Sequence, residues 1–234
     1  MIDAHFTPTP NGHKVSIMLC ETGLAHRLLP YDMLAGDHLT PAFRAINSNA
    51  RLPAIVDHAP VGGGAPLTVF ESGAILLYLA EKTGRFLSSE PRRRVAAQQW
   101  LMWQMAGLGP MHGQAHHFIR YAPEGQDYAV ARYRAEALRL LRVLDRRLGE
   151  AAYLADEYSI ADIACWPWVR ATRAIALDLT PFGAVCDWFD RIAARPAVVA
   201  GTAVANAPNL SRLRPELTDE QWSNLFGANM LAAI

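Results

Sequence analysis

The sequence predicts an α/β domain followed by an all-helical domain. Strand and helix patterns follow one another as β-α-β-α-β-β-α up to residue 84, and a linker containing Ser and Pro follows at residues 84–91. Beyond it, apolar residues recur only at helical spacing. We expect an α/β domain over residues 1–84, an all-helical domain over residues 91–205, and a C-terminal tail over residues 206–234 that packs on the body.

The composition is that of a soluble globular protein. Of its 234 residues, 51% are hydrophobic and 19% are charged, and the net charge is +0. A chain without a basic excess lacks the charge that attracts phosphate backbones or anionic lipids, so no nucleic-acid or membrane partner is expected. No apolar run reaches the roughly 20 residues that span a bilayer, and the first residues do not have the pattern of a secretion signal. We expect a cytoplasmic protein.

Cysteines and histidines are not expected to form a disulfide framework or a metal site. Cys20, Cys165 and Cys186 are odd in number and widely spaced, which favours reduced thiols in the core. His112 and His116 have the i, i+4 spacing of some metal ligands. With no Glu between them and no nearby Cys cluster, we expect no metal there, and we expect the histidines to line the substrate cleft.

The first turn is predicted to join a strand to a helix that favours an anion. Pro8 and Pro10 end strand pairing, and Asn11 and Gly12 are types that suit caps just ahead of a helical pattern from Val15. The free backbone N–H groups at such a helix start attract negative charge.

In the rest of the α/β domain, proline, glycine and serine mark where strands and helices begin and end. Pro53 opens a strand at a position where a cis peptide bond is an option, and residues 61–66 form the turn of a hairpin. Ser72 is placed to cap the next helix and Gly84 to end it.

The helical domain is predicted from long apolar-faced patterns. The pattern over residues 92–118 should kink at Gly107, Gly109 and Pro110. Ser159 and the acid three residues later, Asp162, form a capping box that opens an unusually apolar helix. We expect this helix at the centre of the domain.

These motifs resemble a known family. The strand-turn-helix at residues 6–15, the option of a cis Pro53 and the Glu-Ser helix start resemble the thioredoxin-like glutathione-binding domain, and the whole chain resembles a glutathione S-transferase. Its Thr-Pro-Asn-Gly turn and the runs at residues 70–76 and 159–167 look like the bacterial Nu class. The resemblance implies a homodimer that uses glutathione as co-substrate to reduce disulfides, without a protein thiol and without a metal.

The site implied by this resemblance lies largely in the α/β domain. Thr9 and Asn11 would donate to the glutathione thiolate through a hydroxyl and an amide. The turn holds neither the Tyr nor the Cys of better-known glutathione transferases, which argues against conventional conjugation chemistry. Ser72 suits the γ-glutamyl carboxylate, Glu71 its ammonium group, and the backbone of Leu52 the cysteinyl unit. The alternatives are structural: Asn11 and Ser72 as simple helix caps, and Glu71 as an exposed first-turn acid.

The resemblance implies two further glutathione-binding residues. His38 stands where the family has glutamine, at the glycyl end of glutathione, and Arg132 matches an arginine that reaches glutathione from the neighbouring subunit. Arg132 also fits a solvent-exposed arginine stripe on its helix, a purely structural alternative.

Two other functions stay open on the sequence. The same thiolate could conjugate an apolar electrophile or reduce a hydroperoxide, as a transferase or peroxidase. The fold could also serve as a non-catalytic glutathione-transferase-like binding module, although such a module has no need of paired donors at the thiol.

Overall fold

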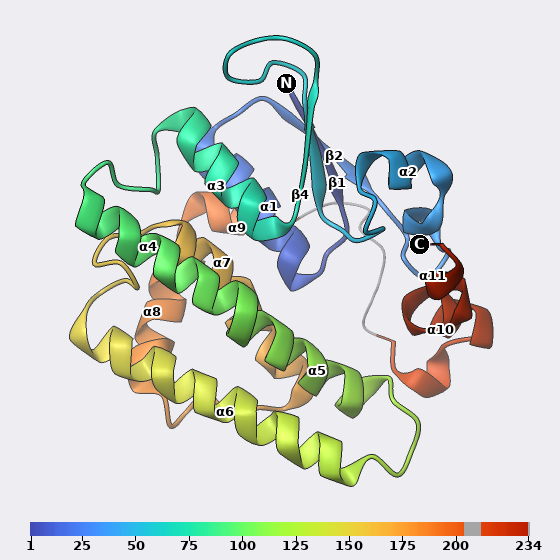
Figure 1. Cartoon of the computed structure of the whole chain (residues 1–234). Coiled ribbons are helices and arrows are strands. Elements are labelled where there is room, and N and C mark those ends of the chain that lie inside the picture. Colours follow the sequence, from blue (N-terminus) through green and yellow to red (C-terminus); the bar gives the residue numbers. More distant parts are fainter. Residues whose placement is uncertain (204–211, 234) are drawn as a thin grey trace. The chain divides into compact units, whose positions relative to one another are not determined.

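The computed structural model describes residues 1–203 and 212–233 (Figure 1). Contacts between residues divide the chain into two compact units, one of Met1–Lys82 with Ala200–Ile234 and one of Thr83–Val199. The predicted start of the tail at residue 206 lies outside the described residues. The domain boundaries that the sequence predicts therefore stay a prediction.

The first unit is built on a mixed four-stranded sheet with the order β2-β1-β3-β4. Its strands are β1 (Ile2–Phe6), β2 (His26–Pro30), β3 (Ala54–Asp57) and β4 (Leu67–Phe70). β1 pairs parallel with β2 and antiparallel with β3, and β3 pairs antiparallel with β4. The predicted α/β arrangement, including the hairpin, is confirmed.

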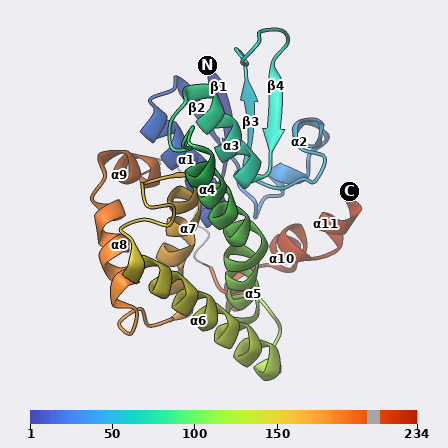
Figure 2. The same ribbon diagram turned by 60° about the vertical axis from the view of Figure 1, so that its left-hand side comes forward.

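Helices cover both faces of this sheet (Figures 1 and 2). One face carries α1 (Pro10–Thr22) and α3 (Ser72–Thr83), and the other carries the short η1 (Asp37–Leu39) and α2 (Pro41–Ile46). Every residue of β1 is buried as a result. A strand covered on both faces reads as a continuous apolar run with few polar breaks, as the start of this sequence does.

The C-terminal helices of the first unit lie against the segment around η1. They are η4 (Arg214–Glu216), α10 (Asp219–Phe226) and α11 (Ala228–Ala232). The amide Nδ2 of Asn224 donates to the carbonyl of Leu34 at 2.9 Å, and Arg44 donates to the carbonyl of Ala233 at 2.8 Å. These bonds connect residues about 190 positions apart.

The second unit is helical, as predicted. Its elements, the last of which extends into the other unit, are α4 (Pro91–Trp103), η2 (Gln104–Leu108), α5 (Gly109–Arg120), α6 (Asp127–Glu150), α7 (Ile160–Ala171), η3 (Thr172–Ile175), α8 (Gly183–Ala193) and α9 (Pro196–Thr202). Residues 160–169 of α7 are all buried, which confirms α7 as the central helix. None of the described helices combines the length and hydrophobicity needed to cross a bilayer.

The break predicted near Gly107–Pro110 is a π-helical turn at Gln104–Leu108 rather than a proline kink. Gly109 makes this turn feasible, because a Cβ there would lie 2.6 Å from Nε2 of the fully buried Gln104. The interruption was therefore predicted at nearly the right place, but its geometry was not.

The capping box at the start of α7 is confirmed. The fully buried carboxylate of Asp162 accepts hydrogen bonds from the backbone N–H groups of Leu154 and Ser159, from the Ser159 hydroxyl and from Nε1 of Trp188. Burial nevertheless raises the pKa of Asp162 to about 6, because the cost of desolvating the charge exceeds what these four donors return. Asp162 therefore links α7 to α8 and to the preceding loop.

Candidate functional site

The strand register brings three segments that hold sequence-predicted residues of the first unit to one edge of the sheet. Phe6, the end of β1, pairs with the end of β2, and the start of β3 pairs with the end of β4. His5 also pairs with Ala54, the first residue of β3. The turn after β1, the residue before β3 and the helix start after β4 therefore meet at this edge.

The turn after β1 caps α1 with Thr9. The Thr9 hydroxyl accepts from the Gly12 N–H at 3.3 Å, and Pro10 begins the helix. The interpretation of Asn11 as the helix cap is wrong, because Asn11 lies inside the first turn. Thr9 and Asn11 are both half-buried.

Gly12 is a residue whose role sequence reasoning missed. A Cβ on Gly12 would lie 2.0 Å from the carbonyl oxygen of Thr7, far inside any real contact. The Thr7 carbonyl also accepts from the Thr9 N–H at 2.7 Å. Only glycine lets the first turn of α1 approach the end of β1 this closely.

Lys14 is the second residue that sequence reasoning missed. Its side chain is fully buried, and its Nζ donates to the Ser72 hydroxyl at 3.2 Å. A buried ammonium group beside the positive N-terminus of α3 makes this place favourable for an anion. The signal for it was a charged residue directly before the apolar positions Val15, Ile17 and Met18 of a helix that packs on the sheet.

Ser72 is the first residue of α3 rather than its cap, which corrects the prediction. Glu71 takes the cap position, since its carbonyl accepts from the Ile75 N–H at 2.9 Å. Glu71 is exposed and has a left-handed φ of 68°, a conformation that costs a non-glycine residue about 1 kcal/mol. Such strain is characteristic of functional positions.

The glutathione contact that the resemblance implies for Ser72 predicts that Ser72→Ala weakens glutathione binding about tenfold. Losing the buried hydroxyl that accepts from Lys14 should also lower stability by about 1–3 kcal/mol. Calorimetric titration and a melting curve measure the two effects. Ser89→Ala, at an exposed site, is the control. A lowered melting temperature with unchanged affinity would make Ser72 a purely structural residue.

Leu52 and His38 differ in how far they are exposed. The Leu52–Pro53 peptide bond is cis, as considered from the sequence, and Leu52 is half-buried just before β3. His38 is only 1% exposed, so a ligand would meet it only after neighbouring side chains move. Burial, together with the nearby charge of Arg51, lowers the pKa of His38. At neutral pH, His38 is therefore an uncharged hydrogen-bonding group.

Arg132 belongs to the other unit. It lies on α6 with 55% of its side chain exposed, 3.6 Å from the Glu136 carboxylate. Arg139 also binds that carboxylate, through two hydrogen bonds at 2.7 and 2.9 Å. Arg132 is thus on an arginine-containing, solvent-facing stripe within one chain, and its role at glutathione stays a prediction.

The cysteines and histidines of the sequence analysis differ in burial. Cys165 is buried, but Cys20 and Cys186 are only half-buried, so the expectation of three core thiols is wrong for two of them. Burial raises the pKa of Cys20, which makes it a poor nucleophile.

His112 is fully buried rather than lining an open cleft. Burial lowers the pKa of His112 and of His116 to about 4. In the described part of the chain, no group of His, Cys and acidic residues is arranged to hold a metal ion.

A thioredoxin-like sheet edge and an all-helical unit define a class, and comparison with known families identifies it. The model for the N-terminal domain of glutathione S-transferases matches residues 9–82, and the model for their C-terminal domain matches residues 127–200. The chain belongs to the glutathione S-transferase superfamily and is Nu-like, which confirms the resemblance seen in the sequence.

Individual relatives and solved structures support the same family assignment. The disulfide-bond oxidoreductase YfcG of Escherichia coli K12 is 54% identical over 198 residues, which is 84% of this chain and 92% of that protein. A glutathione transferase from Pseudomonas putida, solved with one glutathione disulfide per subunit, is 43% identical with a TM-score of 0.82 over 88% of this chain and 92% of that one. A family member from Pseudomonas fluorescens with two glutathione molecules bound is 42% identical with a TM-score of 0.80, over 86% and 92%.

Proposed function

We propose that this protein is a glutathione-dependent disulfide-bond oxidoreductase that uses glutathione thiolates held non-covalently. The observation that carries the proposal is the meeting of two helix N-termini, those of α1 and α3, at one sheet edge beside the buried Lys14. Such an edge suits a ligand with a thiolate and a carboxylate. YfcG, the 54% identical relative, is named for this activity, and the Pseudomonas putida structure holds glutathione disulfide.

The proposed ligand contacts follow the chemistry of each group. Thr9 and Asn11 donate to the sulfur, and Ser72 with the first N–H groups of α3 binds the γ-glutamyl carboxylate. The exposed carboxylate of Glu71 pairs with the γ-glutamyl ammonium group. Leu52 offers its backbone to the cysteinyl unit. His38 binds the glycyl end, after the rearrangement that its burial requires.

The proposed reaction is two successive thiol–disulfide exchanges. One glutathione thiolate attacks a sulfur of the substrate disulfide, forming a mixed disulfide and releasing the first substrate thiolate, which takes up a proton. A second glutathione thiolate attacks the glutathione sulfur of the mixed disulfide, giving glutathione disulfide and the second substrate thiolate. Two glutathione thiols supply the two electrons. The two glutathione molecules in the Pseudomonas fluorescens structure support a site of this capacity.

The proposal includes a cytoplasmic homodimer. Reduced glutathione is abundant in reducing compartments, and three free cysteines suit such a compartment.

The homodimer is suggested by apolar side chains on β4 and α4. Leu67, Phe70, Val95 and Met102 are each between 40% and 59% exposed. Such side chains on β4 and α4 are candidates for burial against a second copy, and Arg132 would then act across the interface.

Parallel assays test the proposed function. Reduction of 2-hydroxyethyl disulfide by glutathione should exceed both conjugation of chlorodinitrobenzene and reduction of cumene hydroperoxide. Conjugation or peroxidase activity without disulfide reduction would replace the proposal with those chemistries, and no activity together with glutathione binding would favour a binding module.

A variant with Cys20, Cys165 and Cys186 all changed to Ala should keep the rate of disulfide reduction. An inactive but folded variant would indicate that a protein thiol takes part in the reaction.

The Asn11→Ala and Thr9→Val variants should each raise the pKa of the bound glutathione thiol by about one unit, which lowers the rate at neutral pH about tenfold. The two losses should not add, because both donors act on one sulfur. Thiolate absorbance of the complex against pH measures the shift. Thr218→Val, which removes the equivalent cap of α10, controls for capping alone. An unshifted titration in both variants would leave activation to the N-terminus of α1.

A further inference from the structure

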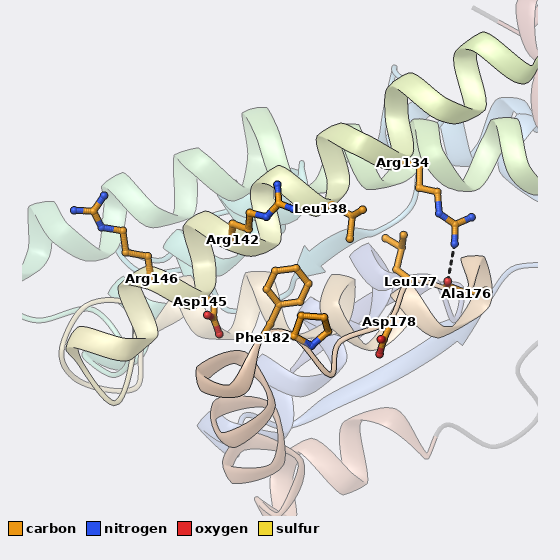
Figure 3. A pocket seen from close by; sticks show the side chains of 10 residues that line it. Arg134, Leu138, Arg142, Asp145, Arg146, Ala176, Leu177, Asp178 and Phe182 are labelled. Atoms are coloured by element: carbon orange, nitrogen blue, oxygen red, sulfur yellow. Dashed lines mark hydrogen bonds between the residues drawn. The ribbon is translucent and has the colours of Figure 1, made fainter.

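Lys14 differs from the surface arginines of this chain in being fully buried. Arg142 and Arg146, for example, extend from α6 beside a hollow of the helical unit and are exposed (Figure 3). Water and salt screen a charge at such a position, whereas a buried charge is screened much less. The charge of Lys14 therefore acts strongly on the groups around it.

Burying an ammonium group is costly, so a buried lysine generally has a structural or a functional role. Lys14 and Lys82 are the two lysines of the chain. Nζ of Lys82 lies 2.7 Å from the carboxylate of the fully buried Asp57, which is a structural ion pair. Lys14 lies on α1, where residues 12–19 are all buried, and its Nζ donates to the Ser72 hydroxyl at 3.2 Å. This contact leads to a residue of the proposed glutathione site.

The contact between Lys14 and Ser72 restricts the direction of the serine hydroxyl. An ammonium group has donors only, so Oγ of Ser72 accepts this hydrogen bond. The single proton of the hydroxyl then points away from Lys14. Ser72 is also the first residue of α3, a helix of 12 residues whose first N–H groups point out of its N-terminus. The hydroxyl and these N–H groups are donors at the same helix end.

A carboxylate at this helix end would interact with the charge of Lys14 through the hydroxyl. Nζ lies 3.2 Å behind Oγ, and a hydrogen bond to a carboxylate extends about 2.7 Å ahead of it, so the two charges would be within about 6 Å. A hydroxyl polarised by a charge donates a stronger hydrogen bond. A neutral carboxamide gains little from that charge, and its NH₂ group would face donors. Lys14 thus favours a carboxylate over an uncharged group of the same shape.

We propose that Lys14 is a positioning residue that makes the start of α3 selective for the α-carboxylate of a γ-glutamyl group. It holds the Ser72 hydroxyl as a donor and places a positive charge behind it. This inference rests on the proposed function, because it assigns a role at the γ-glutamyl end of glutathione. Lys14 acts through Ser72 rather than by touching the ligand.

Calorimetric titration with two ligands tests the proposal: glutathione, and the analogue whose γ-glutamyl α-carboxylate is a primary amide. The wild type should bind glutathione at least about tenfold more tightly, as a charge-assisted hydrogen bond exceeds a neutral one. Lys14→Met keeps an unbranched side chain and removes the charge, so it should lower this preference about fivefold. The KM for glutathione in disulfide reduction should rise, with kcat within about twofold, since the γ-glutamyl end does not react.

Lys82→Met is the matched control, because it removes the other lysine and takes away the cation beside the buried Asp57. It should lower stability but leave the preference for glutathione unchanged. In a double-mutant cycle, Ser72→Ala should weaken glutathione binding less in Lys14→Met than in the wild type, because Lys14 acts through that hydroxyl.

Equal binding of glutathione and its amide by the wild type would overturn the proposal, whether or not the variants fold. An unchanged preference in Lys14→Met, an equal loss in Lys82→Met, or additive effects of Lys14→Met and Ser72→Ala would also overturn it. Normal disulfide reduction beside any of these results would leave the proposed function intact. A wild-type protein that binds no glutathione would refute both.

Discussion

Asp162→Ala should lower the free energy of unfolding by about 3–5 kcal/mol, the usual cost of breaking a buried polar network. The substitution leaves the N–H groups of Leu154 and Ser159 and the indole N–H of Trp188 without their acceptor in the interior. Urea unfolding followed by tryptophan fluorescence measures the loss. Asp156→Ala, which removes an exposed ion pair with Arg147, should cost less than about 1 kcal/mol. Equal losses in the two variants would contradict the structural role of the network.

The raised pKa of Asp162 also gives stability a defined pH dependence. Below its ordinary pKa of 3.8 the carboxyl is neutral in both states, and above about 6 the folded state must keep a buried charge. Its contribution to stability is therefore lost as pH rises through this window. Asp162→Asn removes that titration, so the difference between wild type and variant should be largest near pH 4 and shrink by roughly 3 kcal/mol by pH 7. Parallel stability curves would mean that Asp162 does not titrate there.

Gly12→Ala should reduce glutathione-dependent disulfide reduction at least about 100-fold. A Cβ 2.0 Å from the Thr7 carbonyl forces the first turn of α1 away from β1, and Thr9 and Asn11 move with it. Displacing reacting groups by about 1 Å costs roughly this factor. The rate is measured beside circular dichroism, which reports whether the variant folds.

The matched control is Gly149→Ala, because a Cβ at Gly149 meets nothing within 4 Å. It should leave activity unchanged and stabilise α6 by at most about 1 kcal/mol. A Gly12→Ala protein with activity within twofold of wild type would show that the turn after β1 does not hold the reacting thiolate.

The sequence was sufficient for the fold because its signals are local. Strand and helix periods, the hairpin turn and the Ser159–Asp162 capping box each lie within a few residues. The start of α1 was misplaced for an equally local reason. Thr9 and Asn11 are both good caps, and only Pro10, which favours the first helical position, distinguishes them.

The site was only partly predictable, because several of its determinants are tertiary. A left-handed φ at Glu71 contradicts the preference of glutamate, so nothing local indicated it. The role of Lys14 depends on Ser72, which is 58 residues away. The segment containing His38 lies beside Asn224, from near the end of the chain. No periodicity of the sequence reports such contacts.

The π-helical turn at Gln104–Leu108 has a consequence for how this chain can vary in length. A π turn is an α-helix with one residue inserted, and each residue of a helix advances it by about 100°. The wider turn takes up the extra residue, so deleting one residue from it would restore a regular helix and leave α5, with its buried His112, facing the same way. A one-residue deletion should therefore cost less stability inside this turn than elsewhere in α4 or α5, where it would rotate every following side chain by about 100°.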